Sequence, residues 1–175
     1  PPTPWTVIVA RKKPRAPLTA LPAPEVVFAG PSSDVVDFYS APAHAFFISD
    51  ALFRLIDAID ADSLEHVEIY LRASDADLPF HAVMPRGVLE AIDTRRTKIV
   101  IKYDSVGGTY FQRVRFPEGL VFKNEALQGT ASFSDLDAPG WYWSKDLIER
   151  AQAGGSRGLY AQSVASSPAR EIARL

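Results

Sequence analysis

The stretch Phe46–Arg72, FFISDALFRLIDAIDADSLEHVEIYLR, contains both periodicities that decide the fold. Ser49 occupies the position of a helix N-cap, and Asp50 follows it in the first turn. Behind the cap, apolar residues recur at the spacing of one helix face: Leu52, Leu55, Ile56 and Ile59. This pattern predicts a helix from about Asp50 to Ile59. The period then changes to two in Val67–Arg72, where apolar Val67, Ile69 and Leu71 alternate with Glu68, Tyr70 and Arg72, which predicts a strand.

A second capped helix follows the aromatic run Trp141-Tyr142-Trp143. Ser144 is its predicted cap, and Gly154-Gly155 its predicted C-terminal stop. Three adjacent aromatic side chains cannot all point to the same side of an extended segment. We therefore expect Trp141 and Trp143 to face the core, and Tyr142 to face outward as an anchor for a partner or a cover for a sheet edge.

Further strands are expected between the two helices. Thr97–Tyr103 and Tyr110–Phe116 flank a five-residue loop that ends in Gly107-Gly108, which predicts a β-hairpin. Weaker strands are predicted at Phe80–Met84 and Leu120–Phe122 and, after the second helix, at Gly158–Gln162. Together these elements predict an α+β fold, with a mainly antiparallel sheet flanked by two helices.

The beginning of the chain is rich in proline: eight of the 14 prolines lie in the first 31 residues. Since proline lacks a backbone donor, continuous helix or central strand is not expected there. We predict an extended proline-rich segment over residues 1–38, with Trp5–Ala10 as one possible edge strand, and an α+β domain over residues 39–175. The basic run Arg11–Arg15 fits a solvated turn better than a targeting or nucleic-acid patch.

The composition is that of an ordinary globular protein: 175 residues, a formal charge of −2 and no cysteine. These totals give no reason to expect a membrane or direct nucleic-acid partner, and they exclude disulfides and thiolate metal sites. No secretory signal and no membrane-length apolar run is evident in the sequence, so we expect a cytoplasmic protein. The glycine pairs lack the context of a phosphate-binding loop, and we expect no cofactor.

Catalytic and metal motifs are equally sparse. The three histidines, His44, His66 and His81, lack metal-binding spacing, although His66 and His81 fall in predicted strands and a two-histidine metal site is geometrically possible. No GxSxG motif marks a nucleophile. Asp57, Asp60 and Asp62 can be read as acid–base or Mg²⁺ ligands, or as solvated acids beyond the apolar helix face.

Charge is distributed unevenly along the chain. Residues 50–77 contain eight acidic and two basic residues, whereas residues 86–123 contain eight basic and four acidic ones. Such separated charge favours electrostatic docking to a protein partner. The candidate contacts are Asp57, Asp60 and Asp62 on the acidic side, and Lys98 and Arg113 on the basic side.

The order of elements resembles that of bacterial immunity proteins of polymorphic toxin systems, a family first catalogued as a domain of unknown function. Three motifs carry the resemblance: Phe47-Ile48-Ser49, the segment Leu89–Asp93, and the closing segment from Ser144 through Gly158-Leu159-Tyr160. In the closing segment, Tyr160 replaces the usual phenylalanine. The resemblance covers about residues 45–162. It implies a non-enzymatic cytoplasmic antitoxin that binds a cognate toxin or effector. The alternative is a small-ligand-binding module or hydrolase that uses the carboxylates near residues 57–62.

Overall fold

The computed structural model describes residues 17–20, 22–41, 45–106, 109–116, 118–135, 138, 140–160, 162–167 and 172–174. Within 101–115 and 162–174 it describes the backbone alone. The predictions for Trp5–Ala10, Arg11–Arg15 and His44 lie outside the described residues.

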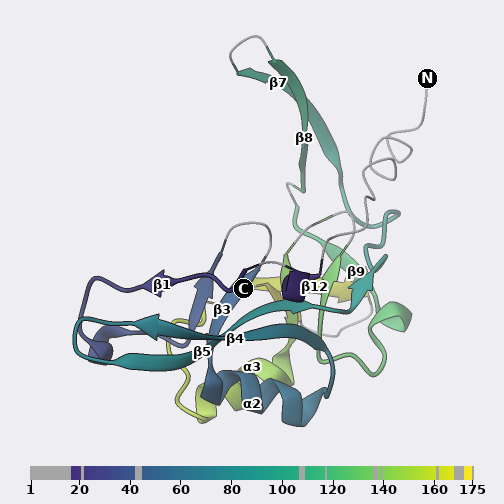
Figure 1. Cartoon of the computed structure of the whole chain (residues 1–175). Coiled ribbons are helices and arrows are strands. Elements are labelled where there is room, and N and C mark those ends of the chain that lie inside the picture. Colours follow the sequence, from purple (N-terminus) through teal and green to yellow (C-terminus); the bar gives the residue numbers. More distant parts are fainter. Residues whose placement is uncertain are drawn as a thin grey trace.

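The described strands form two larger sheets and a separate hairpin, and two neighbouring α-helices pack on the apolar cluster that joins the two sheets (Figure 1). The five-stranded sheet has the order β1-β4-β5-β3-β2, and the six-stranded sheet has the order β6-β10-β11-β13-β12-β9. The α+β class is confirmed. The expected sheet is divided in two, and parallel pairs such as β1 with β4 occur at its edges.

The five-stranded sheet comprises β1 (Val26–Val27), β2 (Phe38–Ser40), β3 (Phe46–Ser49), β4 (Leu64–Arg72) and β5 (Asp77–Pro85). The six-stranded sheet comprises β6 (Val88–Leu89), β9 (Val121–Lys123), β10 (Ser132–Asp135), β11 (Trp141–Ser144), β12 (Gln162–Ser167) and β13 (Ile172–Arg174). The helices are α2 (Asp50–Ile59) and α3 (Lys145–Ala153), and short 3-10 turns span η1 (Leu18–Ala20), η2 (Ser32–Asp34) and η4 (Asn124–Leu127).

Both predicted helix starts are confirmed. The Ser49 and Ser144 hydroxyls accept hydrogen bonds from the backbone N–H groups of Leu52 and Leu147, each at 3.3 Å. The end of α3 is also as predicted, because Gly155 adopts a φ of +81°, a left-handed conformation that glycine tolerates best.

Ser144→Ala should lower the free energy of unfolding by about 1 kcal/mol, because the first turn of α3 loses its side-chain acceptor. Chemical denaturation of the variant measures this cost. Ser144→Asp is the matched control, since a carboxylate restores an acceptor at the same position. Equal losses in both variants would assign the effect to packing rather than to capping.

The strands of the hairpin have the expected length but lie closer to the turn than the sequence suggested. β7 (Val100–Val106) and β8 (Thr109–Arg115) pair as far as Val106 and Thr109, so strand pairing replaces most of the expected five-residue loop. In Figure 1 the hairpin extends away from both sheets. The expected strand at Gly158–Gln162 is displaced as well, because β12 begins only at Gln162 and Gly158 has a φ of +84°.

Three apolar clusters cover the sheet faces. The central cluster lies between the sheets and joins β3 and β5 to α2, α3 and β11, with Trp141 and Trp143 fully buried. A second cluster covers the other face of the six-stranded sheet. The third covers the other face of the five-stranded sheet, where Val35 and Val26 of the N-terminal segment pack. The predicted boundary at residue 38 stays a prediction.

The prediction that Tyr142 points outward is wrong. β11 lies inside the six-stranded sheet between β10 and β13, and this sheet is covered on both faces. Tyr142 therefore points away from the two tryptophans but into the second cluster, where its ring stacks on Phe133 and its hydroxyl donates to the Ala138 carbonyl at 2.9 Å. A fully buried phenol with a satisfied hydroxyl does not serve as a surface anchor.

Candidate functional site

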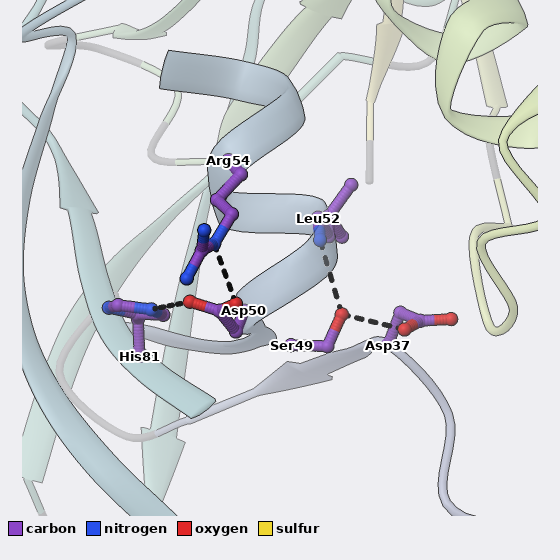
Figure 2. Close-up of polar contacts among 6 residues, drawn as sticks. All are labelled: Asp37, Ser49, Asp50, Leu52, Arg54 and His81. Atoms are coloured by element: carbon purple, nitrogen blue, oxygen red, sulfur yellow. Dashed lines mark hydrogen bonds and ion pairs between the residues drawn. The ribbon is translucent and has the colours of Figure 1, made fainter. Parts of the chain in front are cut away.

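Polar side chains gather where β3 passes into α2 (Figure 2). The Ser49 hydroxyl donates to Asp37 Oδ1 at 2.6 Å while it caps the helix. Asp37 Oδ2 in turn accepts the backbone N–H of Arg157 at 2.7 Å. The cap therefore also ties β3 to the segment before β2 and to the chain that follows α3.

The next residue, Asp50, reaches the opposite way, toward His81 on β5 (Figure 2). His81 Nε2 lies 3.1 Å from Asp50 Oδ1, and Arg54 Nε donates to Asp50 Oδ2 at 2.7 Å. The hydrogen bond from His81 is the main reason that the pKa of Asp50 lies below its usual value, and Arg54 adds to the effect. Asp50 thus remains a carboxylate down to acidic pH.

His81 is held in place by aromatic packing. Its ring stacks on Phe53 of α2 with the centroids 4.1 Å apart, and the His66 ring lies edge-on to it at 5.5 Å. His81 is buried, whereas His66 is exposed. The structure thus brings the two strand histidines together, as the sequence allowed. Among the described residues, no three His, Asp or Glu side chains form a group that can hold a metal ion.

Serine, histidine and aspartate meet here without forming a nucleophile–base pair. The Ser49 hydroxyl bonds to Asp37 and the His81 imidazole bonds to Asp50. A catalytic triad requires the histidine to bond to the serine and to be oriented by the acid. No hydrogen bond between Ser49 and His81 occurs in the described part of the chain, so the observed geometry stabilises the start of α2.

The three predicted acidic contacts have different surroundings. Asp57 is exposed on α2, and Asp62 is exposed in the turn before β4, where its φ is +61°. Asp60 is half-buried and accepts the backbone N–H of Ala131 at 3.0 Å through Oδ2, so it connects the end of α2 to the start of β10. Asp60 is therefore less accessible to a partner than Asp57 and Asp62, because its carboxylate bonds to a distant backbone group.

An exposed surface lies beside α2 along β4. The Phe53 ring contacts the His66 ring at a centroid distance of 4.5 Å, and Asp57 follows Phe53 by one helical turn on the same side. Glu68 pairs in register with His81, and Tyr70 continues the same side of β4 with 69% of its surface exposed. We name this set the α2–β4 surface, and its members are Asp57, Asp62, His66, Glu68 and Tyr70. The alternation in Val67–Arg72 is the sequence signal that places Tyr70 away from the apolar face.

The basic candidates are less concentrated. Lys98 is exposed and forms an ion pair with Glu118, which is also exposed. Arg113 pairs in backbone register with Lys102 in the hairpin, and Arg115 pairs with Val100. The structure therefore brings Arg113 and Lys102 to neighbouring strand positions, while Lys98 precedes β7.

Comparisons with family models, curated proteins and solved structures found no match to this chain. Among the described residues, no helix is both long and apolar enough to cross a membrane.

Proposed function

We propose that this chain is a non-enzymatic, cytoplasmic immunity protein that binds and neutralises a cognate toxin. The α2–β4 surface is the single observation that carries the proposal. It presents a largely exposed tyrosine and several exposed carboxylates along one helix and a neighbouring strand. The resemblance of the Ser-capped helix segments to those of immunity proteins supports the same class.

The composition of the surface indicates how binding would work. Tyr70 supplies apolar area and a hydroxyl at little conformational cost, which is why tyrosine is enriched among the residues that dominate binding energy at interfaces. Glu68 lies two residues from Tyr70 on the same face of β4, and Asp57 and Asp62 add negative charge toward the other end of the surface. Toxin domains that attack nucleic acids need basic substrate-binding surfaces, so an acidic inhibitor surface both steers association and blocks the site.

The alternative function, a hydrolase or ligand-binding module that uses the carboxylates near residues 57–62, has less support. Asp60 is engaged by the Ala131 backbone, and Asp57 and Asp62 are exposed rather than gathered in a pocket. Acid–base catalysis depends on carboxylates whose surroundings separate their pKa values. The basic hairpin is a rival docking surface within the immunity function, and it would suit an acidic partner.

The function is tested by co-expressing the chain with the toxin domain encoded beside its gene. We expect the chain to restore growth and to co-purify with the toxin domain in a stoichiometric complex. Growth rescue without a complex, or a complex without rescue, would contradict neutralisation by direct binding.

The surface is tested by the double reversal Asp57→Lys with Glu68→Lys. We expect the association rate to fall by roughly tenfold at low salt, with a weaker dependence on ionic strength, because steering is electrostatic. Tyr70→Ala should instead raise the dissociation rate by roughly tenfold or more, as loss of an interface anchor does. Stopped-flow association and surface-plasmon-resonance dissociation measure the two effects.

The matched control is Glu125→Lys with Glu149→Lys, which makes the same change in charge at exposed positions on η4 and α3. If both pairs slow association equally, only net charge matters and the α2–β4 surface is not the docking site. If Lys98→Glu with Arg113→Glu is the pair that slows it, the hairpin is the interface.

A further inference from the structure

A half-open cavity lies on the five-stranded sheet, on the face opposite α2, beside the described part of the proline-rich segment. The cavity has a volume of about 190 Å³ and is lined by Leu18, Pro22 and Pro24 of this segment and by Phe47, Val67 and Ala82 of the sheet. The other described lining residues are alanines. It lies apart from both the α2–β4 surface and the polar network at Ser49 and Asp50.

The floor of the cavity follows from strand register. Ala82 on the central strand β5 pairs with Phe47 of β3 on one side and with Val67 of β4 on the other. These three side chains therefore form one row across the sheet. The middle member has only a methyl group, so the row is recessed between two larger side chains.

The rim of the cavity is apolar on the side of this segment. Pro22 and Pro24 are among its lining residues and are exposed to solvent, whereas Leu18 is buried against the sheet. The Leu18 backbone N–H donates to the Glu65 carboxylate of β4 and fastens the segment to the sheet. The acceptor of this hydrogen bond, Glu65, is not among the residues that line the cavity, and the lining itself is apolar.

We propose that this cavity is a binding site for a small, neutral, apolar molecule, such as one with a single aromatic ring or a short branched hydrocarbon. A protein cavity of about 150 Å³ lined by apolar side chains accommodates benzene, so this cavity has adequate room. An ionised ligand is disfavoured because the described lining offers no charge or hydrogen bond to compensate for its lost hydration. The site is independent of toxin neutralisation.

Toluene and benzoate are the probes, because they have the same ring and differ in charge. Titration of the full chain, followed by amide NMR, should give saturable shifts at Phe47, Val67 and Ala82 with toluene and none there with benzoate. Toluene should also raise the midpoint of thermal unfolding, since it binds the folded state. Shifts that are non-saturable, spread over the surface, or equal for both probes would overturn the proposal.

Ala82→Leu fills the cavity from its floor and should weaken toluene binding at least tenfold. Ala58→Leu is the matched control, because it makes the same substitution at an exposed position of α2 and should leave binding unchanged. Val67→Ala provides a second variant should Ala82→Leu fail to fold, since an enlarged cavity should favour naphthalene over toluene. Unchanged toluene affinity in a folded Ala82→Leu, or no change in ligand preference in Val67→Ala, would place binding elsewhere and refute the site.

Discussion

Trp141→Ala is expected to lower the free energy of unfolding by about 3–5 kcal/mol, the usual cost of truncating a buried aromatic side chain. Trp141 is fully buried on β11 and contacts Phe46 of the other sheet at a ring-centroid distance of 5.1 Å and Phe38 at 6.0 Å. It also meets Trp143 edge-on at 4.9 Å. The substitution therefore opens a cavity where the two sheets meet.

Because small domains are stable by only about 5–15 kcal/mol, this one change removes a large part of the total. Chemical denaturation followed by far-ultraviolet circular dichroism measures the loss. Trp141→Phe is the control, since it keeps an aromatic ring at the junction and should cost clearly less than the alanine variant. Equal stability of wild type and Trp141→Ala would show that the sheets do not depend on this contact.

Asp135→Ala should cost about 2–6 kcal/mol through two unpaired backbone donors. Asp135 ends β10 and is 2% exposed. Its two carboxylate oxygens accept the backbone N–H groups of Ala91 at 2.8 Å and Ala138 at 3.1 Å. Alanine leaves both donors without these acceptors, and each buried, unsatisfied N–H costs about 1–3 kcal/mol.

Hydrogen exchange distinguishes this mechanism from simple loss of packing. The amides of Ala91 and Ala138 should lose protection in Asp135→Ala by more than their neighbours do. Asp135→Asn is the matched control, because its carboxamide retains one acceptor oxygen and should restore protection at one of the two amides. Retained protection at both amides in the alanine variant would contradict the proposed role of the carboxylate.

The parts of the fold that depend on near neighbours were predictable from sequence. The helix starts were correct because a serine N-cap bonds to an N–H only three residues along the chain, at Ser49 and at Ser144. The alternation in Val67–Arg72 correctly separated buried Leu71 from exposed Tyr70, because successive side chains of a strand point to opposite faces.

The candidate site was only partly predictable. Asp57 and Asp62 are exposed as expected, but Asp60 bonds to Ala131, 71 residues further along the chain. His66 and His81 were recognised as possible neighbours, yet the carboxylate that contacts His81 belongs to Asp50 at the start of α2. These pairings depend on how distant elements pack, which local sequence patterns do not contain.

The sequence by itself determined where the helices begin and which residues of β4 share a face, because both follow from interactions over a few residues. Only the tertiary structure decided what covers each face. Tyr142 is buried because a second apolar cluster packs on the far side of its sheet. Leu18, Pro22 and Pro24 line one cavity together with Ala82, which is far away in sequence. Burial depends on what the rest of the chain brings to a surface, so alternation alone cannot distinguish a solvated face from a second core.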